Sequence, residues 1–195
     1  MNLIPIQLRH GLRQTQLQHA AQLYFDAFRR QISPILGADN RAVALLRQLI
    51  NPKSVLTACQ DGQIIGLAGL QYNSQRFIQP QLPLFISRFG WILGRIRYRQ
   101  AALLEQPCPP DQLYISGIAV SPEWQGQGIG TWLLNAAVDF ASKHGLEAVH
   151  IQVPNTAPAL KQLCQRLGFI NTATQNRPYL KLFGINQFNT FSKNV

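Results

Sequence analysis

Hydrophobic and polar positions follow two different periods in the first part of the chain. Residues 4–9 alternate with a period of two, which predicts a short opening strand. In residues 15–32 the apolar side chains recur at three- and four-residue spacing, which predicts one amphipathic helix. A second helix is predicted over residues 40–50, with Asp39 or Asn40 as its N-terminal cap.

The middle of the chain combines strand patterns with one long helical pattern. Residues 54–72 are rich in β-formers and contain Asp61-Gly62, which is a strong short signal for a hairpin. Residues 84–105 have helical spacing that two glycines interrupt, so we expect a kinked or broken helix there. Residues 113–120 have the pattern of a buried strand, so the helical segment at about 84–105 stands between two predicted strands.

The last third of the chain alternates helices and strands. No internal repeat or linker divides the chain, and 195 residues with 46% hydrophobic content suffice for one core, so we expect a single domain over residues 1–195. The elements predicted in this part are a helix over residues 131–143, a strand over 148–153, a helix over 158–167, and short strands at about 170–174 and 179–183.

The composition is strongly basic. Eighteen Lys and Arg against eight Asp and Glu give a net charge of +10 and an isoelectric point near 10.2, which indicates anionic partners. A nucleic acid, an acidic acceptor and a phosphate-rich cofactor all satisfy this charge, so composition alone does not choose among them.

Cysteine usage and the N-terminal sequence favour a reducing compartment. The three cysteines, Cys59, Cys108 and Cys164, have no paired spacing, so we expect free thiols and neither a disulfide framework nor a metal cluster. The N-terminus lacks the apolar run of a signal peptide, and no stretch reaches the roughly 18 apolar residues of a membrane span. We therefore expect a cytoplasmic protein without a metal.

Residues 113–130 carry the most informative chemistry. A predicted strand runs into the sequence QGQGIG and then directly into a helix. Gly126, Gly128 and Gly130 let backbone amides converge, and the first turn of a helix leaves its amides unpaired at the positive end of the dipole, so this turn predicts a pyrophosphate site. The turn lacks the Lys-Ser/Thr ending of a P-loop and the glycine spacing of a dinucleotide fingerprint.

The spacing Gln125-x-x-Gly128-x-Gly130 resembles the (Gln/Arg)-x-x-Gly-x-(Gly/Ala) coenzyme A signature of the GCN5-related N-acetyltransferase (GNAT) superfamily. In that family the signature follows a strand that ends in Ala-Val, as Ala119-Val120 does here. The order of elements is also similar over most of the chain, with residues 73–110 the poorest match. Compared with the family, the helical segment at about 84–105 is an insertion between two central strands. The resemblance implies the GNAT fold, an α/β domain with a mixed, mostly antiparallel twisted sheet, helices on both faces and a splayed central strand pair.

The resemblance also implies roles for residues of this strand and turn. The main chain of Ile118 and Val120 is expected to bond the pantetheine arm of acetyl-CoA like an added strand, and the amides of residues 125–131 are expected to hold the pyrophosphate. A main-chain N–H near Ile118 is expected to face the thioester oxygen and to stabilise the oxyanion. The implied cofactor-binding residues are Ile118, Ala119, Val120, Gln125, Gly126, Gln127, Gly128, Ile129, Gly130, Thr131 and Asn155.

The position of the usual acid departs from the family pattern. Many relatives carry a tyrosine four residues before the Gly-Phe that ends the last helix, and this chain has Cys164 there, whereas a register counted from Asn155 gives Gln162. A thiol can donate a proton, so Cys164 is the candidate acid, although a buried cysteine is more often a packing residue. Water is the alternative donor.

The position of the usual base departs as well. Relatives often place a carboxylate on the signature strand where this chain has Ser116-Gly117, and a neutral serine does not replace it. Other candidates are Glu105, Asp111, Asp26 and His150, of which we favour Glu105. A water relay would make a protein base dispensable.

Residues 84–105 also form a basic amphipathic pattern, in which Arg88, Arg95 and Arg99 share one helical face. Such arginines are most often a solvated face. Contact with membrane lipid, with RNA or with the acceptor are the alternatives.

The sequence therefore predicts an enzyme that moves an acetyl group from acetyl-CoA to a primary amine by direct attack. The missing tyrosine and carboxylate leave a non-catalytic acyl-CoA-binding or regulatory module as the first alternative, and the basic charge leaves a nucleic-acid-binding domain as the second. The acceptor, which the charge suggests is anionic, and the oligomeric state, a homodimer included, stay open.

Overall fold

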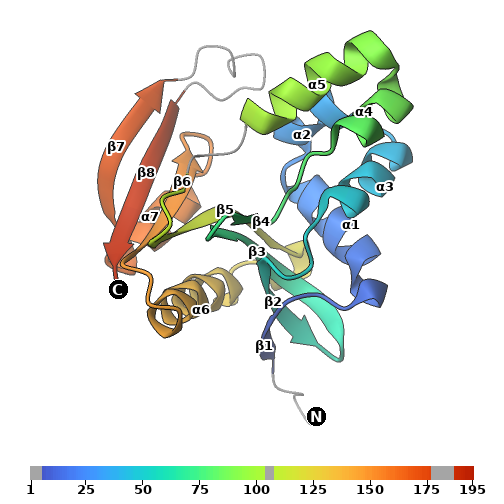
Figure 1. The fold of residues 1–195 in the computed structure, drawn as a ribbon. Coiled ribbons are helices and arrows are strands. Elements are labelled where there is room, and N and C mark those ends of the chain that lie inside the picture. Colours follow the sequence, from blue (N-terminus) through green and yellow to red (C-terminus); the bar gives the residue numbers. More distant parts are fainter. Residues whose placement is uncertain (1–5, 104–107, 177–186) are drawn as a thin grey trace.

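The structure is a computed structural model that describes residues 6–103, 108–176 and 187–195. Its described strands form one sheet in the order β1-β2-β3-β5-β6-β8-β7, with β4 paired to β3 (Figure 1). Among these strands only β5 and β6 pair in parallel, so the predicted mixed, mostly antiparallel sheet is confirmed. The strands are β1 Gln7–His10, β2 Val55–Gln60, β3 Gln63–Tyr72, β4 Gln75–Arg76, β5 Gln112–Val120, β6 Ala148–Pro154, β7 Ile170–Asn176 and β8 Gln187–Asn194.

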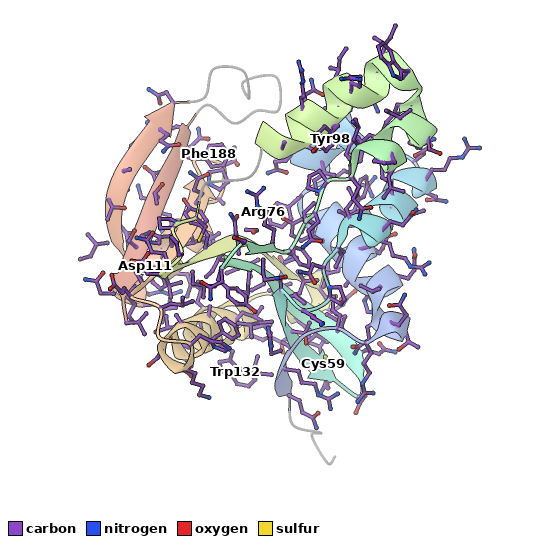
Figure 2. The ribbon with its side chains drawn as sticks, viewed as in Figure 1. Cys59, Arg76, Tyr98, Asp111, Trp132 and Phe188 are labelled. Carbon is purple, nitrogen blue, oxygen red and sulfur yellow. The ribbon has the colours of Figure 1, made fainter. Side chains whose placement is uncertain are left out.

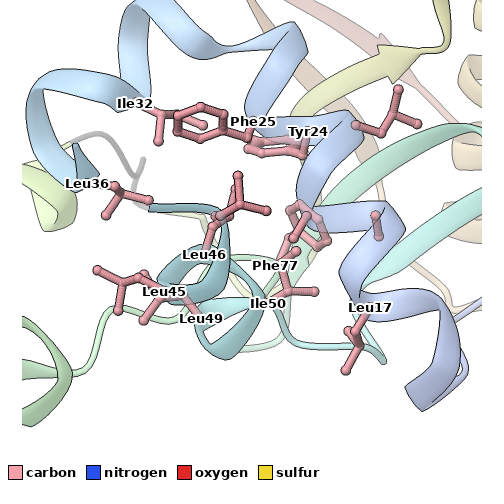
Figure 3. Close-up of a cluster of buried hydrophobic side chains, with 14 of the residues drawn as sticks. Leu17, Tyr24, Phe25, Ile32, Leu36, Leu45, Leu46, Leu49, Ile50 and Phe77 are labelled. Atoms are coloured by element: carbon pink, nitrogen blue, oxygen red, sulfur yellow. The ribbon is translucent and has the colours of Figure 1, made fainter. Parts of the chain in front are cut away.

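Helices cover both faces of the sheet, as predicted (Figure 1). Buried side chains on α1 to α5 form one cluster with one face of β2 and β3, and part of this cluster is drawn in Figure 3. Side chains on α6 and α7 form the second cluster with the opposite face. None of the helices in the described ranges has the length and hydropathy needed to cross a bilayer. The helices are α1 Leu17–Ala27, α2 Arg29–Leu36, α3 Asn40–Leu49, α4 Leu82–Phe89, α5 Trp91–Leu103, α6 Ile129–Lys143 and α7 Pro158–Arg166.

Two predictions based on local signals are confirmed. Asp61 (φ 52°) and Gly62 (φ 78°) both adopt the left-handed backbone that a tight hairpin between β2 and β3 requires. Asp39 caps α3, because its Oδ1 accepts the N–H of Ala42 at 3.1 Å.

The predicted single helix over residues 15–32 is wrong, because its backbone breaks at Phe28 into α1 and α2. A Cβ on Gly117 of β5 would lie 2.7 Å from Cζ of Phe28, so the phenyl ring occupies the space that a side chain on this strand would fill. The same ring packs on Tyr24 with the two centroids 4.5 Å apart. The break thus accompanies a contact with a strand far away in the sequence, which the local pattern does not report.

The helical segment at 84–105 is broken, as predicted. The break lies at Gly90 (φ 79°), where α4 ends and α5 begins. Gly94 does not interrupt α5. A Cβ at Gly94 would lie 2.6 Å from the carbonyl oxygen of Phe85, so this glycine lets the two helices pack closely.

The end of the chain differs from the prediction. The strand expected at about 170–174 is present as β7, whereas the strand expected at about 179–183 lies outside the described residues. The sequence pattern missed β8, because its buried positions include the polar residues Asn189, Thr190 and Ser192. Pairing with β6 on one side and β7 on the other stabilises this strand, and neither partner is adjacent to it in sequence.

Candidate functional site

The central strands β5 and β6 part in the middle of the sheet. They pair only over Gln112–Ile115 of β5 and Ala148–Ile151 of β6. Beyond these residues β5 continues along β3, and β6 continues along β8. The splayed strand pair implied by the family resemblance is therefore confirmed.

An extra residue in β5 marks the point where the strands part. The register with β3 shifts between Gly69 and Leu70, so Ser116 of β5 has no partner on that strand. Such a bulge bends a strand and increases its local twist. The bend begins one residue after Ile115, the last residue that pairs with β6.

The far half of β5 offers free main-chain groups to the gap. Ser121 donates its N–H to the carbonyl oxygen of Ile65 at 2.9 Å, so the N–H groups that face β3 are those of Ser121 and, by alternation, Ala119. The N–H and C=O groups of Ile118 and the N–H of Val120 point to the other side, where no described strand pairs with them. The C=O of Val120 accepts a hydrogen bond from the side chain of Gln125. An extended ligand can therefore bond this edge as an added strand.

Two glutamine side chains stabilise the turn after β5 by hydrogen bonds to the main chain. Gln125 donates from Nε2 to the carbonyl oxygen of Val120 at 3.1 Å, and Gln127 donates from Nε2 to that of Glu123 at 2.8 Å. Gly126 (φ 78°) and Gly128 (φ 83°) then adopt left-handed backbone with nothing within 4 Å of the Cβ that each lacks. This conformation favours glycine, and the missing side chains leave the main chain accessible.

The amides that follow this turn have the arrangement that an anion site requires. The first backbone bond of α6 runs from the N–H of Trp132 to the carbonyl oxygen of Gly128 at 3.0 Å. In the described part of the chain, the N–H groups of residues 126–131 have no backbone acceptor. They lie at the positive end of the α6 dipole, where a phosphate group is favoured.

One cleft of about 1210 Å³ joins the turn, the gap and the opposite helices. Its first end is lined by the turn, the start of α6 and one side of α7, including Thr131, Leu163 and Arg166. Its second end is lined by α1 and α2, including Tyr24 and Asp26. The cleft is continuous, so groups bound at its two ends can meet at the parted strands.

The structure brings together most of the expected cofactor-binding residues. Ala119 is buried against the α1 side, and Gln127 and Asn155 do not line the cleft, although Gln127 shapes the turn through its bond to Glu123. Asn155 instead donates its N–H to the carbonyl oxygen of Gln187 at 3.0 Å. The expected residues that line the cleft are Ile118, Val120, Gln125, Gly126, Gly128, Ile129, Gly130 and Thr131.

Neither of the two candidate catalytic residues from the sequence is found among the described residues that line the cleft. Cys164 is fully buried in the cluster beneath α6 and α7 and does not line the cleft. Burial raises the pKa of its thiol to about 11, so the thiol stays neutral near physiological pH. Glu105 lies outside the described residues.

The other candidate bases differ in their environments. Asp26 is the only carboxylate among the described residues that line the cleft, and it pairs with Arg29 at 2.6 Å. A hydrogen bond from Gln22 and the contact with Arg29 lower the pKa of Asp26, which makes it a weak base. Ser116 is exposed in the cleft, whereas Asp111 is an exposed residue that does not line it.

His150 lies on β6 beside a smaller hollow of about 470 Å³ rather than in the main cleft. Its Nδ1 lies 2.6 Å from Oγ of Ser192, and its ring stacks on Tyr114 with centroids 5.7 Å apart. Its Nε2 is buried without a hydrogen-bond partner in the described residues, and burial lowers the pKa of the imidazole. The neutral form is therefore favoured at this position.

Sequence reasoning missed several cleft residues. Tyr24, which fits the apolar pattern of the helix predicted over residues 15–32, lines the cleft beside Gly117. Gln152 lines the cleft with a buried Nε2 that has no partner among the described residues. The alternation of His150 and Gln152 along a predicted strand is the one signal that could have identified a polar face there. In the same described ranges, no three His, Cys, Asp or Glu side chains gather to hold a metal ion.

The chain is similar in sequence to known acetyltransferases. The family described as "Acetyltransferase (GNAT) family" matches residues 17–169. A probable N-acetyltransferase camello from Xenopus laevis is 29% identical over 82 residues, which are 42% of this chain, and the chain spans only 36% of that relative.

Two solved structures share the fold at low identity. An N-acetyltransferase from Staphylococcus aureus Mu50 has a TM-score of 0.69 and 14% identity, covering 96% of this chain and all of the other. The ribosomal-protein-S18-alanine N-acetyltransferase from Escherichia coli has a TM-score of 0.60 and 17% identity, covering 98% of this chain and 94% of the other. With the family match over most of its length and this fold, the chain belongs to the acetyltransferase (GNAT) family.

Proposed function

We propose that this protein transfers an acetyl group from acetyl-CoA to a primary amine by direct attack. The observation that carries the proposal is the position of the unpaired amides of residues 126–131 at the mouth of the gap between β5 and β6. One end of the cleft thus suits a pyrophosphate, and the strand edge beside it suits an extended pantetheine arm.

The donor is held mainly by the main chain. The pyrophosphate accepts hydrogen bonds from the amides that follow Gly126 and Gly128, and the pantetheine amides bond Ile118 and Val120. The charge of Arg166, which lines the same cleft from α7, favours the phosphate groups further. Asn155 and Ala119 contribute through the backbone that positions their neighbours.

The reaction takes place where the strands part. The amine lone pair attacks the thioester carbonyl carbon, and the N–H of Ile118 stabilises the oxyanion that forms. The intermediate then collapses to an amide, and the coenzyme A thiolate leaves. Since a thiol has a pKa of about 8.5, this thiolate leaves near neutral pH without a side-chain acid, and Cys164 acts only in packing.

Water takes the proton from the attacking amine. Ser116 carries no charge at the position where relatives often have a carboxylate, and the lowered pKa of Asp26 makes that residue a poor acceptor. Glu105, the base favoured from sequence, stays a prediction, because it lies outside the described residues.

The acceptor enters from the α1–α2 end of the cleft. Arg30 lines this end, and the net charge of the chain is +10, so we propose an amine that carries a negative charge elsewhere in the molecule. Apolar side chains of α2 also line this end, among them Ile32 and Ile35, and they exclude water from the acceptor.

Release of free thiol from acetyl-CoA tests the proposal against a panel of amines. Acidic lysine peptides and acidic N-terminal peptides match the proposed negative charge, and polyamines and aminoglycosides serve as cationic comparisons. At least one amine should raise thiol release well above hydrolysis, and acetyl-CoA should raise the melting temperature more than dephospho or truncated analogues do. A melting shift without thiol release for any amine would favour a non-catalytic acyl-CoA-binding module. No shift with acetyl-CoA but a shift with RNA would favour a nucleic-acid-binding domain.

A further inference from the structure

Exposed apolar side chains are concentrated at one end of α5. Of the eight large hydrophobic side chains that are exposed in the described part of the chain, four lie within six residues: Trp91 (65% exposed), Ile92 (70%), Leu93 (44%) and Ile96 (49%). We call these four residues the α5 patch. Single exposed apolar residues are common, whereas a contiguous group marks an interaction surface. The patch lies on the helix pair at the edge of the molecule, away from α6 (Figure 1).

Close packing of α4 on α5 fixes the outward direction of this patch. The glycine at position 94 faces α4, because a Cβ there would lie 2.6 Å from the carbonyl oxygen of Phe85. Tyr98, one turn further, packs edge-on against Phe85 with centroids 6.0 Å apart, and Ala101 is buried. The side of α5 that carries Ile92 and Ile96 is therefore turned away from the protein.

Two of the four arginines in this helix pair have partners within the protein. Arg88 of α4 bonds both carboxylate oxygens of Asp39 at 2.8 Å. Arg97 lies over the ring of Phe89, 4.1 Å from its centroid, and bonds the carbonyl oxygen of Ile35. The predicted single basic face is therefore wrong for Arg88, because the break at Gly90 puts it on another helix.

The other two arginines flank the α5 patch. Arg95 and Arg99 are exposed and follow Ile92 and Ile96 by three residues each, so cationic and aliphatic side chains alternate along one face. Arg95 also lies over the ring of Trp91, 5.0 Å from its centroid. From residue 82 to residue 103 the chain has no acidic residue, so this face carries only positive charge.

We propose that the α5 patch docks on an anionic membrane surface. Trp91, Ile92 and Ile96 enter the boundary between headgroups and acyl chains, while Arg95 and Arg99 bind lipid phosphates. An anionic membrane matches both the apolar side chains and the arginines, since hydrocarbon and negative charge lie within one interface. A second copy of the chain on the same patch would instead bring like-charged arginines together across a twofold axis.

Docking in this way leaves the cleft accessible. Ala101, near the other end of α5, lines the cleft, and it lies ten residues or about 15 Å along the helix axis from Trp91. The proposal does not depend on the transferred group or on the identity of the acceptor. It concerns only where the protein acts, which is at a membrane surface.

Vesicle flotation of the full chain tests the proposal. The protein should float with vesicles of phosphatidylcholine that contain about a third of phosphatidylglycerol, and it should stay behind with phosphatidylcholine alone. The double variant Ile92→Ser/Ile96→Ser should lower partitioning by about tenfold or more, because the apolar anchor is lost. The variant Arg95→Gln/Arg99→Gln should lower it by about fivefold for each arginine.

Matched control variants distinguish this proposal from nonspecific binding of exposed apolar side chains to vesicles. Ile170→Ser removes an isoleucine of β7 that is 71% exposed, and Trp132→Ser removes an exposed tryptophan of α6, far from α5 in Figure 2. Both controls should float like the parent protein, and all variants should keep the parent's melting shift with acetyl-CoA. Three results would overturn the proposal: no flotation, equal loss in the controls, or a dimer in sedimentation velocity that Ile92→Ser/Ile96→Ser dissociates. A loss of acetyl transfer to every amine would leave the lipid result unaffected.

Discussion

The glycine turn yields the sharpest test of the donor site. Gly128 has φ 83°, and a Cβ added there would meet nothing within 4 Å. Gly128→Ala therefore causes no clash with the described residues. It should lower the free energy of unfolding only through the left-handed backbone, by about 1–2 kcal/mol. In a chain of this length that corresponds to a fall in melting temperature of about 2–8 °C.

The same methyl group has a larger effect on the ligand. Gly128 lines the cleft, so its Cβ would stand where the pyrophosphate approaches the amides of residues 126–131. Loss of one hydrogen bond to a charged group costs about 1.5–3 kcal/mol. The dissociation constant of coenzyme A, measured by calorimetry, should therefore rise about 10- to 100-fold. Gly128→Val should raise it further.

Gly168 provides a matched control for the backbone strain. It has φ 80°, a Cβ there would also meet nothing within 4 Å, and it does not line the cleft. Gly168→Ala should lower the melting temperature about as much as Gly128→Ala does and leave coenzyme A affinity unchanged. If both variants lost affinity equally, or if Gly128→Ala kept the parent's affinity, the assignment of the turn to the pyrophosphate would be refuted.

Three further predictions concern residues around the site. Cys164→Ala should cost about 1–2 kcal/mol of stability and keep most turnover, because a buried thiol with a pKa of about 11 is a packing group; a loss of about 100-fold, with the basic limb of the pH profile abolished, would make it the acid. Burial lowers the pKa of His150 below its ordinary 6.5, so the folded chain takes up this proton less readily than the unfolded chain. The contribution of His150 to stability should therefore be complete above pH 6.5 and decline as the pH falls. Thermal melts of His150→Gln should show a shallower loss of stability with falling pH, whereas an identical loss would assign the effect elsewhere. Gly117→Ala should cost about 1–3 kcal/mol in urea unfolding, since its Cβ would lie 2.7 Å from Phe28, and Phe28→Leu should recover part of the loss; additive losses would contradict this contact.

The parts of the fold that sequence predicts are those set by short-range chemistry. The hairpin at Asp61-Gly62 and the cap at Asp39 depend on residues within a few positions of one another, and both are present as expected. The glycine turn after β5 is of the same kind, because its conformation follows from Gly126 and Gly128 themselves. Each of these features can be read without knowing what packs against it.

The features that sequence missed are set by contacts between distant segments. Nothing near Phe28 signals a helix break, since neither glycine nor proline stands at the break, and the contact that accompanies it comes from Gly117 on β5. β8 has polar residues at buried positions, which a hydrophobic pattern reads as surface, and its partners β6 and β7 lie on either side. Tertiary packing overrides local preference in both cases.

The donor half of the cleft is set by local sequence, whereas the acceptor half is set by contacts between distant segments. This difference explains why the donor could be inferred from the sequence and the acceptor could not. The donor half consists of main-chain groups. A main chain that exposes its amides requires glycines, and their spacing is visible in the sequence. The acceptor half consists of side chains from α1, α2, β5 and β6, such as Tyr24, Ser116 and Gln152, which meet only after folding. None of these residue types is unusual at its position in the sequence. An acceptor that depends on these side chains must therefore be identified by assay. Its binding should then map to the part of the cleft between α2 and β5.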